Sequence, residues 1–183
     1  MPIEIKVKKI EAWDQVNEEF VWLPSTTLVL EHSLLSISKW ESKWKKPFLG
    51  KDEKTNEQVI DYIKCMAINK KTVNDLYFSN LSVKDIRRIT DYIGDSMTAT
   101  WFNEQNMPRG SRMGEVVTSE LIYYWLVQLG IPFEVEKWHL NRLLTLVQIC
   151  NIKQQKPKKM SKKDIMQQNA ALNRARRAKA GLK

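Results

Sequence analysis

Histidine and cysteine are the residues of this sequence that could most readily act as a base, a nucleophile or a metal ligand. His32 and His139 stand far apart, and neither has a neighbour at the spacing of a metal site or a catalytic pair. Cys65 and Cys150 are too few for a four-thiolate zinc site or a disulfide scaffold. The sequence also lacks a glycine-rich phosphate loop, a Gly-x-Ser-x-Gly motif and a His-Glu-x-x-His motif. We therefore expect a protein that is not an enzyme and that holds no metal or cofactor.

Tryptophan is unusually frequent in the chain. The seven residues are Trp13, Trp22, Trp40, Trp44, Trp101, Trp125 and Trp138. Two interpretations stay open: the rings belong to the core, or some form an interface, where Trp supplies a large contact area at low entropic cost. Trp125 and Trp138 lie on apolar segments and suit the core, whereas Trp13 stands in a predicted polar turn. Trp40 and Trp44 share one face of a lysine-rich helix, and we take them as candidate partner-binding residues.

The net positive charge of the chain comes entirely from its C-terminal end. The sequence has a net charge of +9, from 30 Lys and Arg residues against 21 Asp and Glu. Residues 1–150 hold 19 basic and 20 acidic residues and residues 151–183 hold 11 and one, so that −1 and +10 give +9. This suits a polyanionic partner (nucleic acid, an anionic membrane surface or an acidic protein face), unless the segment only aids solubility. The candidate partner-binding residues here are Lys158, Lys159, Lys162, Lys163, Arg174, Arg176 and Arg177.

The candidate basic residues lie on a predicted helix and on a predicted loop. Most of residues 162–180 are strong helix formers, which predicts a helix of about 18 residues that is marginal alone in water. Residues 103–114 are polar and contain Gly and Pro, which predicts a long loop. This loop is either an exposed connector or a functional segment, and its Arg109 and Arg112 are further candidates for partner binding.

The N-terminal residues 1–32 carry the patterns of short β-strands. Residues 3–7 alternate between apolar and polar side chains, and residues 20–23 and 27–30 are apolar runs separated by Pro24 and Ser25. This pattern predicts a small antiparallel meander, which must pack on the helices that follow because it is too small to be stable alone.

Residues 33–150 are predicted to form a helical body. Capping patterns at Thr55, Ser82 and Thr118 mark the starts of three helices, and Gly130 followed by Pro132 separates two strongly apolar segments. These segments, residues 118–129 and 134–151, predict a pair of antiparallel helices at the centre of the bundle or at an interface.

The predicted fold class is therefore mainly α, and α+β overall. It comprises a meander at 1–32, a helical body at 33–150 and a basic C-terminal tail at 151–183. Helix propensity predicts that this tail is helical. The longest apolar run, Leu121–Val127, is too short to span a bilayer, and the N-terminus lacks the layout of a signal peptide. We expect a soluble intracellular protein.

Two long motifs resemble a family of tailed-bacteriophage proteins that are encoded among the tail genes and usually labelled tail assembly chaperones. The first motif is the run from Leu30 to Leu49, which contains the residues EHSLLSISKWESKWKKPF. The second runs from Thr118 to Trp125 and continues through IPFE at 131–134 and WHLNRLLTL at 138–146. The similarity covers nearly the whole chain, including the basic tail, and it supplies no catalytic residues.

The resemblance implies a protein of the host cell cytoplasm that binds the tape-measure protein or the tail-tube subunits before the tail polymerises. An aromatic helical surface would bind apolar stripes of the helical tape measure, and the basic tail would bind acidic stretches. Self-association into an oligomer is a further expectation. Two alternatives stay open: a structural protein of the virion tail or its connector, and a nucleic-acid-binding accessory protein.

Overall fold

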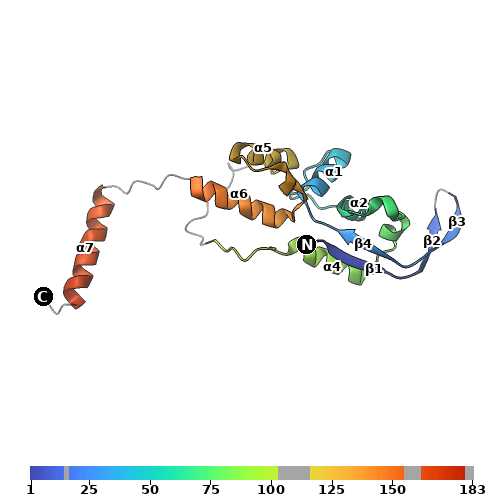
Figure 1. The fold of residues 1–183 in the computed structure, drawn as a ribbon, viewed down its shortest axis with the longest axis horizontal. Helices are drawn as coiled ribbons and strands as arrows, with labels where there is room; N and C mark the ends of the chain where they lie inside the picture. Colours follow the sequence, from blue (N-terminus) through green and yellow to red (C-terminus); the bar gives the residue numbers. More distant parts are fainter. Residues whose placement is uncertain (15–16, 103–115, 155–161, 180–183) are drawn as a thin grey trace. The chain divides into compact units, whose positions relative to one another are not determined.

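The computed structural model describes residues 1–14, 17–102, 116–154 and 162–179 of the chain. It divides into two compact units, Met1–Ile152 and Lys153–Lys183. The first unit combines helices with a small antiparallel β part, and the second contains a basic helix, so the predicted fold class is confirmed (Figure 1).

The β part is one long hairpin with a break in the middle. Its strands are β1 (Ile3–Val7), β2 (Ile10–Asp14), β3 (Glu19–Leu23) and β4 (Thr26–Leu30). β1 pairs with β4 and β2 pairs with β3, both antiparallel, and the register continues without a shift from one pair to the other. Pro24 lies in the break, where it has no N–H to give to the ladder. The predicted three-stranded meander is wrong in its arrangement, because β2 was missed and two strands, rather than three, run side by side.

The buried side of the hairpin changes at this break. In β1 the buried side chains include Ile5 and Val7, whereas in β2 Ala12 is buried. Because alternate residues of a strand face opposite sides, the step from odd to even numbers moves the covered face to the other side of the ribbon. α4 (Val83–Gly94) contacts β1 and α3 (Leu76–Ser79) contacts β2. Figure 1 shows β2 and β3 as an outward continuation of β1 and β4.

Helices begin at the three positions where the sequence predicts caps. The remaining ones are α1 (Leu34–Trp44), α2 (Asn56–Met66), α5 (Ser119–Leu129), α6 (Leu140–Gln154) and α7 (Lys162–Lys179), with short 3-10 turns at Lys70–Thr72 and Phe133–Lys137. Thr55 and Gln58 form the predicted capping box, and Ser82 and Thr118 accept from backbone N–H groups three residues on. Gly130 ends α5 with a φ of 65°, a left-handed conformation that favours glycine.

The apolar pair around Gly130 differs from the prediction. Residues 133–137 form a 3-10 turn, and the second helix, α6, begins only at Leu140. α5 buries Ile122 and Leu126 but leaves Tyr124 and Val127 exposed, at 56% and 60%. α5 is therefore covered on one side only, and of its two predicted places the centre of the bundle is wrong.

A buried carboxylate joins α1 to α5. Glu41 is 7% exposed, and its Oε1 accepts a hydrogen bond of 2.7 Å from the backbone N–H of Phe48. Its Oε2 accepts a hydrogen bond of 2.8 Å from the backbone N–H of Ser119, at the start of α5. A carboxylate is favoured there because the N-terminus of a helix carries partial positive charge.

Replacing Glu41 with alanine is expected to lower the free energy of unfolding by about 2–3 kcal/mol, since two backbone donors lose a charged acceptor. Urea denaturation followed by circular dichroism measures this change. Ser42→Ala, at the neighbouring exposed position, is the matched control and should stay within about 0.5 kcal/mol of the wild type. An equal effect of both substitutions would show that the Glu41 junction contributes nothing to stability.

Candidate functional site

The two tryptophans predicted to bind a partner pack against α2 instead. Trp40 is 1% exposed, and its Nε1 donates a hydrogen bond of 2.9 Å to the backbone oxygen of Gln58. Trp44 is half-buried, and its Nε1 donates a hydrogen bond of 2.9 Å to Asp61 Oδ2. The prediction that Trp40 presents a binding surface is wrong, because the stripe that it shares with Leu34 and Ile37 is the buried face of α1.

The opposite side of α1 contributes to a groove lined by lysines. The groove has a volume of about 860 Å³, and its polar residues include Lys39, Lys43, Lys64 and Lys70. Lys43 pairs with Asp61, and Lys64 pairs with Asp75 at 3.5 Å. Ile68, which is 61% exposed, adds an apolar surface to the same groove. The arrangement suits a segment that carries both acidic and apolar side chains.

The predicted basic residues divide into three groups. Arg109, Arg112, Lys158 and Lys159 lie outside the described residues. Lys162 and Lys163 stand in the first turn of α7, which is the helix predicted for the tail. The remaining three, Arg174, Arg176 and Arg177, are exposed in its C-terminal half.

The basic helix has few apolar side chains of its own. Met166 and Leu172 are exposed, at 73% and 49%, and Arg174 and Arg177, three positions apart, lie on the same side of the helix. Helices of this length that lack packing partners are marginal in water.

A peptide of residues 151–183 should therefore show low helicity by circular dichroism and gain helicity with trifluoroethanol. Full helicity of the free peptide would contradict this expectation.

An aromatic surface covers the outer side of the β2–β3 hairpin. Trp13, Phe20 and Trp22 are 45%, 67% and 60% exposed, and we call these three residues the aromatic face. Trp13 and Phe20 are cross-strand partners with ring centroids 4.9 Å apart in an edge-to-face arrangement. The Lys9 Nζ lies 4.7 Å from the centroid of the Trp22 ring. Exposed aromatic clusters of this kind are typical of binding surfaces.

The sequence predicts only part of this surface. Trp13 is unusual for a core residue because it stands in a predicted polar turn, whereas Phe20 and Trp22 belong to an ordinary strand pattern. A signal was present, since Val21 and Leu23 are apolar on the other side of the same strand. A ribbon of two strands that is apolar on both sides and covered on one must expose the other.

The two histidines, far apart in sequence, meet in the core. The rings of His32 and His139 are buried with centroids 5.1 Å apart. His32 Nδ1 and the Tyr62 hydroxyl are hydrogen-bonded at 2.5 Å, and His139 Nε2 donates to the backbone oxygen of Tyr92 at 3.0 Å. The Tyr92 hydroxyl donates to Glu31 Oε1 at 2.5 Å. Their separation in the sequence does not indicate this contact.

Burial keeps this cluster uncharged at its rings. It lowers the pKa of His32 to about 4, with a further contribution from His139. Burial also lowers the pKa of His139, and it raises the pKa of the Tyr62 hydroxyl well above its usual value. In neutral His139, Nε2 carries the proton and Nδ1 accepts from the backbone N–H of Asn141 at 3.3 Å.

The cluster links elements from four parts of the chain. His32 precedes α1, Tyr62 belongs to α2, Tyr92 to α4 and His139 precedes α6, whose first residue Leu140 donates its N–H to the His32 oxygen at 2.7 Å. A cavity beside it has a volume of about 160 Å³, below the range of about 300–1,000 Å³ that is typical of ligand sites. We interpret the cluster as a structural junction between these elements.

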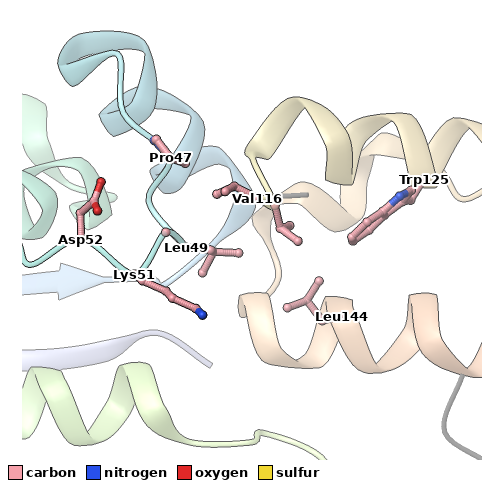
Figure 2. A pocket seen from close by; sticks show the side chains of 9 residues that line it. Pro47, Leu49, Lys51, Asp52, Val116, Trp125 and Leu144 are labelled. Carbon is pink, nitrogen blue, oxygen red and sulfur yellow. The ribbon is translucent and has the colours of Figure 1, made fainter. Parts of the chain in front are cut away.

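A larger apolar groove lies next to α5. It has a volume of about 650 Å³ and is lined by Pro47, Leu49, Gly50, Lys51, Asp52, Val116, Val117, Trp125 and Leu144. Figure 2 shows Leu49 and Lys51 on one side of this groove and Val116, Trp125 and Leu144 on the other. α5 therefore contributes Trp125 to a groove and presents Tyr124 and Val127 to solvent.

The described residues form no grouping of three His, Cys, Asp or Glu side chains that could hold a metal ion. In the same parts of the chain, no helix is both long and apolar enough to cross a membrane. Comparison of the chain with family models, with curated proteins and with solved structures finds no match. The function is therefore inferred from the surfaces described above and from the resemblance of the sequence motifs.

Proposed function

We propose that this protein binds the tape-measure protein or the tail-tube subunits of a tailed bacteriophage in the host cell cytoplasm, while the tail is being assembled, and that it does so without catalysis. The observation that carries the proposal is the uncovered apolar side of α5. Glu120 is the single charged residue of this helix, and Tyr124 and Val127 expose more than half of their surface. A helix with this composition buries its second side against a partner.

The tape measure supplies a fitting partner, because it is a long helical chain with apolar stripes. Such a stripe would lie along Tyr124 and Val127, and its larger side chains would enter the groove beside Trp125. Acidic stretches of the same chain would bind the lysine-lined groove and the arginines of α7. The resemblance of the sequence to tail assembly chaperones supports this choice of partner.

The test is co-purification with the tape-measure protein of the same phage. Replacing Tyr124 and Val127 with glutamine, which preserves helix propensity, should weaken binding by about tenfold or more, because two exposed apolar contacts are lost. Val83→Gln is the matched control, since Val83 is 85% exposed on α4 and should leave binding unchanged. Undiminished capture by the double variant would remove the α5 surface from the proposal.

A protein that acts only during assembly should be absent from finished particles. Mass spectrometry of purified virions is expected to find the tape-measure and tube proteins without this chain. Its presence in stoichiometric amounts would favour the alternative of a structural tail or connector protein.

Nucleic-acid binding is a second candidate function. It is favoured by the exposed arginines of α7, which are Arg174, Arg176 and Arg177. If about six phosphates were contacted, the logarithm of the affinity for double-stranded DNA would fall with the logarithm of salt concentration at a slope near −5. A flat salt response would exclude this candidate.

A further inference from the structure

The β2–β3 hairpin combines an uncovered aromatic face with negative charge. Glu11, the cross-strand partner of Trp22, lies on the aromatic face, and Asp14, Glu18 and Glu19 lie at the tip of the hairpin. Residues 10–23 contain no Lys or Arg, while Lys9, just before β2, lies against the Trp22 ring. The inner side of the hairpin is occupied, since Ala12 and Leu23 are 2% and 5% exposed. A partner of the hairpin must therefore bind its outer side, and the acidic tip beside the aromatic rings favours a partner that is cationic and able to pack on them.

The chain itself contains an element with this chemistry. α7 carries exposed Arg174, Arg176 and Arg177, and Asp164 is its single acidic residue. Arginine suits the aromatic face because its planar guanidinium stacks on Trp and Tyr rings while it pairs with carboxylates.

Stacking of cations on tryptophan already occurs in the body of the protein. Arg142 Cζ lies 4.6 Å from the ring centroid of Trp138, and Lys9 Nζ lies 4.7 Å from that of Trp22. Two hairpins from different copies would instead bring acidic residues together, which is unfavourable. The chemistry therefore favours a pairing between unlike surfaces.

We propose that the aromatic face of one copy of this protein binds the basic helix α7 of a second copy. Such an interface joins two different surfaces, so each bound copy still has one free hairpin and one free α7. An interface of this kind generates rings or open chains rather than closed dimers. This inference goes beyond the proposed function, because it concerns contacts between copies and does not involve the tape measure.

The test uses two full-length variants, each lacking one of the two surfaces. The hairpin variant carries Trp13→Thr, Phe20→Thr and Trp22→Thr, which preserve strand propensity, and the helix variant carries Arg174→Gln, Arg176→Gln and Arg177→Gln. In sedimentation velocity at low salt, the wild type should form species that grow with concentration. Each variant alone should remain monomeric, and an equimolar mixture should form a heterodimer that grows no further.

The strength and the salt dependence of the heterodimer provide the quantitative readout. Replacing Trp22 with threonine in the helix variant, which supplies the intact aromatic face of the heterodimer, should weaken heterodimer formation by about thirtyfold, the size of a hot-spot tryptophan. Raising the salt concentration should weaken the heterodimer, because opposite charges are screened.

Three outcomes would overturn the proposal. They are a wild type that stays monomeric at every concentration, a helix variant that still self-associates, and a mixture of folded variants that does not form a heterodimer. Far-UV circular dichroism and thermal midpoints like those of the wild type establish that both variants are folded. Since the tape measure is absent, failure here leaves the α5 proposal intact, and failure of the co-purification leaves this one intact.

Discussion

Replacing Trp40 with alanine is expected to lower the free energy of unfolding by about 3–5 kcal/mol, the range for large aromatic residues removed from a core. The side chain is 1% exposed and packs edge-to-face on Phe48, with ring centroids 5.2 Å apart. Its loss leaves a cavity between α1 and α2, and it also removes the donor that satisfies the backbone oxygen of Gln58. A chain of this size has a total stability of about 5–15 kcal/mol, so the variant approaches the limit of folding.

Urea denaturation followed by circular dichroism at 222 nm measures the effect of Trp40→Ala. Trp22→Ala is the matched control, because Trp22 is the same residue type at 60% exposure and should cost no more than about 1 kcal/mol. Similar losses in the two variants would contradict the assignment of Trp40 to the core and reopen its role as a surface residue.

Acidification is expected to destabilise the protein through the buried histidine cluster. The pKa of His32 is about 4 in the folded protein and about 6.5 in the unfolded chain. Between these values the unfolded chain binds the proton more strongly, so stability is fully present above pH 6.5 and falls as the pH decreases to 4. The difference corresponds to a loss of about 3 kcal/mol, and His139, whose pKa is also lowered, adds to it.

Urea denaturation at intervals between pH 7 and pH 4 tests this dependence. His32→Asn is the informative variant, since an amide can replace Nδ1 as the partner of the Tyr62 hydroxyl but does not titrate. Its stability at pH 7 should be lower than that of the wild type, and its loss on acidification should be smaller by about 3 kcal/mol. An equal loss in wild type and variant would show that other groups, such as carboxylates, account for the acid sensitivity.

Local signals in the sequence predict the starts of α2, α4 and α5 and the end of α5. The bonds of Thr55, Ser82 and Thr118 to the backbone each span three residues, so a short stretch of sequence contains all the atoms involved. The stop at Gly130 is local in the same sense, since it needs one residue that tolerates a positive φ. The helix of the basic tail also follows from the propensities of its own residues.

The spacing of Trp40 indicates a buried position, whereas its residue type alone suggests an interface. Leu34 and Ile37 share the stripe of Trp40, and a stripe of this composition indicates a buried face. In the hairpin, the apolar spacing of two changes after Val7, and Ile10 then begins a second set of alternate positions. This change of parity marks the break and the missed strand β2.

Contacts between distant residues could not be predicted from one sequence. Whether His32 meets His139 depends on how α1, α2, α4 and α6 pack, and no spacing along the chain encodes that arrangement. The same holds for Glu41, whose carboxylate oxygens accept hydrogen bonds from the backbone N–H groups of Phe48 and of Ser119 at the start of α5. Such residues look like ordinary polar positions of a helix until the partner element is in place.

The continuous register of the N-terminal ribbon has a consequence for the order of folding. Pairing of Asp14 with Glu19 closes only a short loop, whereas pairing of Ile3 with Leu30 directly would close almost the whole segment at a greater entropic cost. Because the two strand pairs share one register, pairing that starts at the tip and extends inward brings β1 and β4 together step by step. We therefore expect the tip to form early in folding, so that substitutions there slow refolding more than they accelerate unfolding.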